Sequence, residues 1–284
     1  MAIFSNQATL TYNGSTTNSN IVYGELLEVL TATKTAVEGT YLPGELVTYV
    51  VTLRNTGSTA LSGLTISDDL GGYPFGTGTL YPLTYEPDSI LVFANGIPQA
   101  APAVTAGPPL VISGISVPAS GDTVIVYQAR VNSFASPESG GTIVNTVTIT
   151  GGGLVSPVTA TETVSAESAP ALTITKSISP SQVVDNQQIT YTFLIQNTGN
   201  TAVVATYNAV VTDTFDPILS NLVVSLDGTP WTQGVQYSYA PATGVFTTNP
   251  GQILVPAATY TQDPTTGAYS ITPGTATLTV IGTV

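Results

Sequence analysis

An internal repeat constrains the fold of this chain more than any other feature. The segment L-T-A-T-K-T-A beginning at Leu30 recurs as L-T-I-T-K-S-I beginning at Leu172. In each copy a tyrosine follows the lysine by 15 positions, and an N-T-G tripeptide follows the same lysine by 21 positions. Later segments match as well, because I-S-D-D-L in the first copy corresponds to V-T-D-T-F in the second. Self-similarity of this kind marks one structural unit used twice, so the sequence predicts two copies of one domain.

The two copies end differently. The first continues through I-V-N-T-V-T-I-T at residues 143–150 and V-T-A-T-E-T-V at residues 158–164, whereas the second reaches Val284 without a counterpart. Residues 1–29 resemble the missing piece, since N-Q-A-T-L-T-Y-N-G is followed by a polar turn and I-V-Y-G-E-L-L-E-V. We therefore expect three parts: a donor strand or hairpin at 1–29, a first domain at 30–168, and a second domain at 169–284 that lacks its final strand.

The N-terminal segment alternates like a half-buried strand. Apolar residues and one asparagine share a face in both the leading segment and its internal counterpart, with Thr, Ser or Gln mostly between them: Phe4, Asn6, Ala8, Leu10 and Tyr12, and likewise Ile143, Asn145, Val147 and Ile149. A period of two places these residues on one side of a strand. The alignment puts Asn6 at the position of Asn145.

Composition indicates an all-β protein. Helix formers are scarce, Thr, Val, Gly and Pro are abundant, and 284 residues suffice for two domains with their own cores. Only 4 residues are basic against 17 acidic, for a formal net charge of −13, so we expect no nucleic-acid partner. Charged residues make up 7% of the chain, and such a neutral polar surface is more typical of an extracellular scaffold than of a cytosolic enzyme.

The chain contains neither cysteine nor histidine. This excludes disulfides and thiolate metal sites, and it removes the commonest general base. Acidic pairs at Asp68 with Asp69 and Asp213 with Asp216 have no dense oxygen-ligand loop around them, so we expect no metal and no cofactor. We expect no turnover of an external substrate. The N-terminus M-A-I-F-S-N-Q predicts neither a secretory signal nor a membrane span.

Three polar residue types lie on predicted core faces. Strand alternation places Lys34 with Leu30 and Ala32, and it places Lys176 with Leu172 and Ile174. The same test turns Asp68, Asp213, Asn145 and Asn6 inward. An isolated buried charge is costly, so these groups must interact with one another.

Two interpretations of this pattern stay open. In one, a buried Lys–Asp ion pair has an asparagine beside it, or a register error leaves all three in solvent. In the other, a neutral lysine attacks the asparagine amide carbon while the aspartic acid polarises the amide oxygen and relays protons, forming an isopeptide bond and releasing ammonia. That bond would join Lys34 to Asn145 with help from Asp68. In the second domain, Lys176 and Asp213 would take Asn6 from another subunit.

These motifs resemble the domain-of-unknown-function-11 repeats, which are immunoglobulin-like β-sandwiches of bacterial surface proteins. The shared features are the T-K first strand, the G-E-L-V-T-Y and N-Q-Q-I-T-Y strands, the N-T-G turn and the N-T-V-T-I-T final strand. The resemblance implies two tandem immunoglobulin-like β-sandwiches. The duplicated domain in a 29.1 kDa chain also resembles the main proteins of bacterial endospore appendages, which implies a spore-surface fibre.

The strand that the second domain lacks stands at the start of the chain, and this arrangement predicts self-association. Residues 1–29 either fold back onto their own second domain or enter that of a neighbour, and the short junction at Leu30 favours the neighbour. A head-to-tail contact of this kind generates a filament, although a pairwise swap into a closed dimer stays open. The alternative is a monomeric surface adhesin, in which Trp231 and the tyrosines at 237, 239, 260 and 269 bind glycans.

Overall fold

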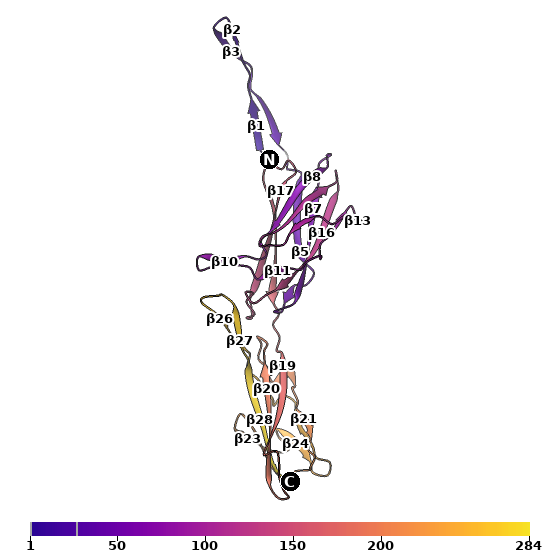
Figure 1. Ribbon diagram of the computed structural model, residues 1–284, viewed down its shortest axis with the longest axis vertical. Helices are drawn as coiled ribbons and strands as arrows, with labels where there is room; N and C mark the ends of the chain where they lie inside the picture. Colours follow the sequence, from indigo (N-terminus) through magenta and orange to yellow (C-terminus); the bar gives the residue numbers. More distant parts are fainter. Residues whose placement is uncertain (1, 27) are drawn as a thin grey trace. The chain divides into compact units, whose positions relative to one another are not determined.

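The computed structural model describes residues 2–26 and 28–284 of the chain. The described residues form strands and connecting loops, together with one short 3-10 turn, η1 (Ala205–Tyr207). They divide into two compact units, the first made mainly of residues 2–164 and the second mainly of residues 165–284. This confirms the predicted all-β class with two β-sandwiches (Figure 1). No helix in the described part of the chain is long and apolar enough to cross a membrane.

The first sandwich consists of two six-stranded sheets. The first sheet contains, in spatial order, β13 (Ile97–Pro98), β12 (Leu91–Ala94), β16 (Asp122–Val131), β7 (Leu46–Asn55) and β5 (Leu30–Ala36), with β11 (Leu83–Tyr85) also paired to β16. The second contains β14 (Ala103–Thr105), β15 (Leu110–Val117), β8 (Leu61–Asp68), β17 (Thr142–Gly151), β18 (Val158–Ala166) and β6 (Thr40–Tyr41). A small hairpin joins β9 (Tyr73–Phe75) to β10 (Gly78–Leu80).

The core of the first sandwich lies between these sheets because their strands alternate. Along β7, every second residue from Val47 to Leu53 is buried, and the residues between them are half-buried. Strand β16 repeats this pattern, with Ile125, Tyr127 and Ala129 buried. The period of two places these side chains on the inner faces of the two sheets.

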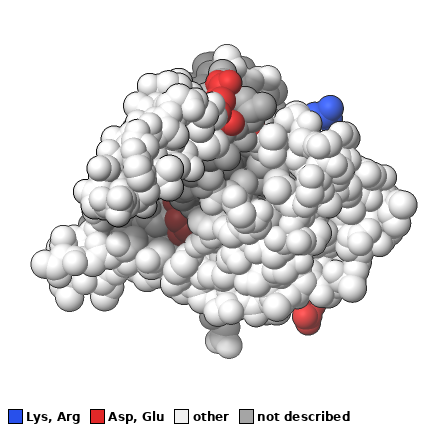
Figure 2. All heavy atoms as spheres, turned by 90° about the horizontal axis from the view of Figure 1, so that it is seen from above, with Lys and Arg blue, Asp and Glu red and all other residues white. Residues whose placement is uncertain are grey.

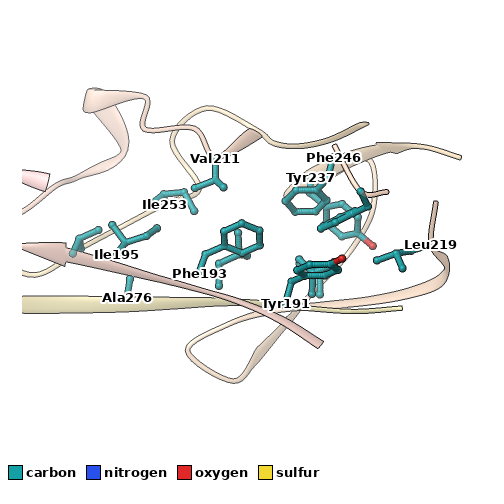
Figure 3. Packing of buried hydrophobic residues seen from close by; sticks show 14 of the residues in the cluster. Tyr191, Phe193, Ile195, Val211, Leu219, Tyr237, Phe246, Ile253 and Ala276 are labelled. Atoms are coloured by element: carbon teal, nitrogen blue, oxygen red, sulfur yellow. The ribbon is translucent and has the colours of Figure 1, made fainter. Parts of the chain in front are cut away.

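The second sandwich is smaller. One five-stranded sheet contains β19 (Leu172–Ser179), β20 (Gln188–Asn197), β28 (Gly274–Thr283), β22 (Ser220–Leu226) and β23 (Thr229–Trp231). The facing sheet has only β21 (Thr212–Thr214), β25 (Val245–Thr248) and β24 (Tyr237–Ala240), and β26 (Thr259–Gln262) pairs with β27 (Tyr269–Thr272) as a separate hairpin. Its core includes Phe193, Phe246 and Ala276 (Figure 3).

The final strands of the first sandwich have no counterpart among the described residues of the second. In the first sandwich β17 pairs with β8 beside the aspartate strand, and β18 follows β17. In the second sandwich β21 carries the equivalent aspartate and pairs with β25 on one side only. Within the described residues, β21 therefore has a free edge where β8 has β17.

The N-terminal segment forms two small antiparallel pairs. Strand β1 (Ala2–Asn6) pairs with β4 (Val22–Leu26), and β2 (Thr9–Tyr12) pairs with β3 (Ser15–Asn18) through a turn at Asn13 and Gly14. The single strand predicted over residues 4–12 is thus interrupted at Gln7 and Ala8. Both turn residues have positive φ, the geometry that favours Asn-Gly in a two-residue hairpin.

Matching registers confirm that the two sandwiches are copies of one design. Leu30 of β5 lies opposite Asn55 of β7, and Leu172 of β19 lies opposite Asn197 of β20. Counting along these ladders makes Lys176 the equivalent of Lys34, since each lies four residues beyond its leucine.

The N-T-G turns explain why the repeat keeps an asparagine at this point. The buried Asn55 amide donates to the carbonyl oxygens of Thr59 at 2.8 Å and Pro118 at 3.1 Å. Asn197 makes the same two bonds to Thr201 and Pro256, at 2.7 Å and 3.0 Å. Each side chain closes its own loop and ties it to a second loop segment, which accounts for the shared motif.

The surface carries few charges. Figure 2 shows a face on which only scattered acidic and basic side chains interrupt an otherwise uncharged surface. This agrees with a chain in which 7% of residues are charged.

Candidate functional site

A buried ion pair joins the two sheets of the first sandwich. Lys34 comes from β5 in one sheet and Asp68 from the end of β8 in the other. The distance from Lys34 Nζ to Asp68 Oδ2 is 2.7 Å, and the two residues are 4% and 0% exposed. Burying two charges is costly unless each has close partners, so this contact fixes the spacing of the sheets at this point.

The Asp68 carboxylate is held at both oxygens. The backbone N–H of Leu70 donates to Oδ1 at 2.7 Å. The hydroxyl of Tyr127, on β16, donates to Oδ2, the same oxygen that contacts Lys34. Tyr127 stacks on Tyr49, with ring centres 5.7 Å apart, and Lys34 Nζ lies 4.7 Å from the centre of the Tyr49 ring.

Asn145 lies beside this cluster. Val147 of β17 is the partner of Asp68 in the ladder, and Asn145 lies two positions further along the same face. Asn145 is fully buried, and in the described part of the chain neither its amide nitrogen nor its amide oxygen has a hydrogen-bond partner. An unmet buried polar group costs about 1–3 kcal/mol, so such groups are rare in folded proteins. The buried Tyr49 hydroxyl likewise has no hydrogen-bond partner among the described residues.

Burial sets the protonation behaviour of this cluster. It lowers the pKa of Lys34, and the charge of Asp68 opposes that shift, followed by smaller contributions from Asp69 and Glu162. Burial also raises the pKa of Tyr49 and of Tyr127. The lowered pKa brings the neutral amine, the nucleophilic form of lysine, within easier reach beside the buried Asn145 amide, which also acts on the Tyr49 and Tyr127 hydroxyls.

The equivalent cluster in the second sandwich is open. Lys176 of β19 contacts Asp213 of β21 through Nζ and Oδ2, so the predicted pairing forms. The Lys176 side chain is nevertheless 40% exposed and that of Asp213 is 17% exposed, against 0% and 1% for the first pair. The lysine is on the predicted face, but nothing in the described part of the chain covers it.

The same contrast extends along the whole strand. Leu30 is 4% exposed, whereas its equivalent Leu172 is 43% exposed, and Ile174 and Ile178 beside it are 52% and 44% exposed. Every residue of β19 is exposed. The expected inward side of this strand is therefore an open apolar face, which we call the acceptor face; its residues are Leu172, Ile174, Lys176 and Ile178.

The predicted donor residues are also exposed. Phe4 is 58% exposed, Leu10 62% and Tyr12 60%, and Asn6 and Ala8 are exposed as well. Asn6 lies opposite Val22 within the β1–β4 pair. Phe4 lies opposite Gly24, and its ring occupies the space that a Cβ at Gly24 would need. In a single chain, Asn6 therefore pairs inside its own hairpin.

The sequence motifs do not indicate a role for the tyrosines of the first cluster, Tyr49 and Tyr127. Glu162, half-buried on β18, also acts on Lys34. The available signal was the alternation along β16, which turns Tyr127 inward, but a tyrosine in a core is ordinarily packing.

The aromatic residues considered for glycan binding mostly pack inside the second sandwich. Tyr237 is buried, and Trp231 and Tyr239 pack against the same core. The Tyr239 hydroxyl donates to the backbone oxygen of Leu219 at 2.8 Å. Among the described residues, no group of three acidic side chains could hold a metal ion.

Comparisons with known proteins give only a general likeness. No family model matches the chain and no curated protein matches its sequence, so the resemblance to domain-of-unknown-function-11 repeats and to endospore appendages stays a hypothesis. Solved structures similar to it include the pilus backbone protein of Streptococcus pneumoniae, at 11% identity and a TM-score of 0.34, covering 86% of this chain and 55% of that one. The full-length major pilin of Corynebacterium diphtheriae has 12% identity, a TM-score of 0.36 and coverage of 86% and 59%.

A third similar structure is the major pilin subunit of Bacillus cereus, at 11% identity and a TM-score of 0.36, covering 96% of this chain and 73% of that one. The chain spans less than two thirds of the length of the first two pilins. All three TM-scores are low, so the functional argument rests on the two clusters.

Proposed function

We propose that this protein is a structural subunit that polymerises head-to-tail into a fibre. The N-terminal segment of one copy completes the second sandwich of the next. A fibre built this way belongs on an extracellular or spore surface, and its partner is another copy of the same chain. The protein turns over no external substrate.

The contrast between β5 and β19 carries this proposal. The two strands have the same register, the same lysine and the same pairing with aspartate, yet the lysine is buried on one and open on the other. In the first sandwich β17 lies beside β8 and β18 follows it. A strand placed beside β21 would occupy the position of β17 and cover the acceptor face. Strand addition to an unpaired sheet edge is a common mode of protein recognition.

The N-terminal segment has the pattern that this position requires. Aligning Asn6 with Asn145 places Ala8 and Leu10 where Val147 and Ile149 lie. These two residues of β17 are fully buried in the first sandwich, whereas Leu10 is 62% exposed in the single chain. Burying the exposed apolar surfaces of donor and acceptor together would stabilise the contact at about 25 cal/mol per Å².

Each site would then form a covalent bond. In the first sandwich the Lys34 ammonium gives a proton to Asp68, and the neutral amine attacks Cγ of Asn145. A bond forms between Lys34 Nζ and Asn145 Cγ while the bond from Cγ to the amide nitrogen breaks. A proton from Nζ passes through Asp68 to the departing nitrogen, so one ammonia leaves for each bond and no cofactor is needed.

The unmet hydrogen bonds of Asn145 support this chemistry. Both polar atoms of the amide are buried without partners in the described part of the chain. Replacing the amide by a bond to the neighbouring lysine removes one of these unmet groups. At the joint between subunits, Lys176 and Asp213 would react in the same way with Asn6 of the next copy.

The decisive experiment is a denaturing gel of assembled protein boiled in detergent, with the intact mass of every band. We expect a ladder at multiples of the chain mass, with one ammonia lost for each bond. Lys176→Ala and Asn6→Ala should each reduce the ladder to monomer that still lacks one ammonia from the first sandwich. Lys34→Ala is the matched control, because it should keep the ladder and lose only the internal bond.

Other results of the gel and mass measurements test the covalent joint, the internal bond and the open fibre separately. A monomer band lacking one ammonia would mean that the joint is non-covalent, and a monomer at full mass would contradict both bonds. A band stopping at the dimer would indicate a closed pairwise swap. Deleting residues 1–14 should leave soluble, non-polymerising protein, and unchanged polymerisation would contradict the donor role of this segment.

A further inference from the structure

The hydroxyl of Tyr127 distinguishes the two clusters. It donates to Asp68 Oδ2, the oxygen that also contacts Lys34. The donated bond reaches across the sandwich, because Tyr127 is on β16 and Asp68 is on β8 of the facing sheet. Together with the bond from Leu70 to Oδ1, it leaves the carboxyl group little freedom to rotate.

The second sandwich has no hydroxyl at this position. Tyr127 lies opposite Tyr49 in the β16–β7 ladder, and Val280 lies opposite Tyr191 in the β28–β20 ladder. Tyr49 and Tyr191 are equivalent by the repeat, so Val280 is the counterpart of Tyr127. Asp213 has a bond to Oδ1 from the backbone of the adjacent Thr214, at 2.9 Å, and the contact of Oδ2 with Lys176.

We propose that Tyr127 is a positioning residue that aims Asp68 during bond formation in the first sandwich, and that Val280 makes the joint between subunits the slower of the two sites. This inference rests on the proposed isopeptide chemistry. It adds an order of events, because the internal bond would close during folding of each subunit and the joint would close after subunits assemble.

The physical reason is the direction of proton movement. Asp68 must take a proton from Lys34 and then present it to the amide of Asn145, so the rate depends on how well its carboxyl group is oriented. Tyr127 supplies that orientation without touching the reacting atoms. A hydrogen bond to a charged group contributes enough that its loss corresponds to a rate change of about ten- to a hundredfold.

The first test measures the rate of ammonia loss in Tyr127→Phe. The full chain is purified in denaturant before it links, refolded, quenched at timed intervals and weighed. We expect the internal bond to form about ten- to a hundredfold more slowly than in the wild type. Tyr41→Phe is the matched control, because it also removes a buried hydroxyl, which donates to the Ser136 carbonyl at 2.7 Å outside the cluster.

An unchanged rate in Tyr127→Phe, or an equal slowing in Tyr41→Phe, would overturn the inference. A wild-type chain that loses no ammonia would instead overturn the proposed crosslinking itself. The two failures are therefore distinguishable in one series of mass spectra.

The dependence of the rate on pH separates positioning from a merely structural role. The titratable groups around the pair are Lys34 on β5, Tyr49 on β7, Asp68 with the adjacent Asp69 on β8, Tyr127 on β16 and Glu162 on β18. Without the Tyr127 hydroxyl, Asp68 Oδ2 has only Lys34 as a partner, so Lys34 keeps its proton to higher pH. Tyr127→Phe should therefore lower the maximal rate and move the upper pH limit of the rate profile upward; a profile of unchanged shape would overturn the inference.

Transfer of the hydroxyl provides a gain-of-function test. Val280→Tyr places a tyrosine at the matching position of the second sandwich, and covalent ladder growth in assembled fibres should become about tenfold faster. Because Val280 is fully buried, the larger side chain can overpack the core and block assembly. The result is therefore scored only on fibres that assemble, with Tyr127→Phe deciding independently.

Discussion

The first and second sandwiches carry the same lysine and aspartate in the same register, and only the first encloses them. Lys34 is inaccessible because β17 and β18 complete its sandwich, whereas the Lys176 side chain keeps 40% of its surface in solvent. The comparison shows that a strand pattern specifies which way a side chain faces, while burial depends on which other strands are present. The second copy thus keeps the lysine and the aspartate, but among the described residues no strand takes the place of β17.

The largest expected difference between the copies concerns their aspartates. Asp68→Ala leaves a buried lysine without its partner, so the first sandwich should lose at least about 3–5 kcal/mol of its free energy of unfolding. Asp213→Ala removes the partner of a lysine in contact with solvent, and the loss in the monomer should be under about 1 kcal/mol. Urea titrations followed by Trp231 fluorescence, which reports only on the second sandwich, and by circular dichroism would measure both.

Equal losses from these two substitutions would contradict the contrast in burial. Asp216→Ala, which removes a nearby acidic group without touching Lys176 in any described contact, is the control for the change in net charge.

The next largest difference is expected between substitutions of the equivalent leucines, Leu30 and Leu172. Leu30→Ala deletes a buried side chain and should destabilise the first sandwich by about 2–5 kcal/mol. Leu172→Ala should cost the monomer less than about 1 kcal/mol, because the side chain is 43% exposed. In assembled fibres the cost of Leu172→Ala should rise toward that of Leu30→Ala, and a cost that does not change on assembly would contradict coverage of the acceptor face.

Substitution of the two turn asparagines should destabilise both sandwiches by similar amounts. Asn55→Ala and Asn197→Ala abolish three matching bonds to the backbone, and Asn197 loses one more, from the N–H of Ala171, so each sandwich should lose about 2–3 kcal/mol. Chemical denaturation of each variant measures this loss. Unequal losses would show that the second sandwich is loosened throughout rather than only along β19.

The smallest expected effect is a pH dependence of the first sandwich. Because the pKa of folded Lys34 is lowered, the unfolded chain binds the proton more tightly, and stability should rise with pH up to the ordinary lysine value of 10.5. Because the pKa values of Tyr49 and Tyr127 are raised, stability should fall once pH exceeds 10.0, where unfolded tyrosine ionises.

The unlinkable variant Asn145→Ala, titrated with urea at several pH values, should therefore be most stable near pH 10. The slope should be below about 1.4 kcal/mol per pH unit for one proton. A monotonic fall with rising pH would contradict the lowered pKa of Lys34.

Much of the fold could be predicted because the repeat and the alternation report on local geometry. Equal spacing from lysine to tyrosine and to N-T-G fixed the shared register of β5 with β7 and of β19 with β20. Alternation also turned Lys34, Asp68 and Asn145 toward the core, where they are buried. It could not indicate that Lys176 would be exposed, since that depends on strands distant in the chain.

Two further structural features could not be predicted from the sequence. The break between β1 and β2 at Gln7 and Ala8 arises because each half pairs within its own hairpin, and alternation continues unbroken through that point. The hydrogen bond from Tyr127 to Asp68 depends on the facing of two sheets, which periodicity within a single strand does not encode. The substitution of Val280 at the equivalent position becomes visible only when the ladders are compared.

The placement of Lys34 and Asn145 within the first sandwich also has a mechanical consequence. Lys34 lies on the first strand of the sandwich and Asn145 on β17, which is followed in the two sheets by only one further strand of that sandwich. In the proposed linked form, tension along a fibre would pass directly from β5 to β17 and bypass the hairpins between them. Those intervening strands would then carry no load, so pulling would not lengthen the sandwich by unravelling it.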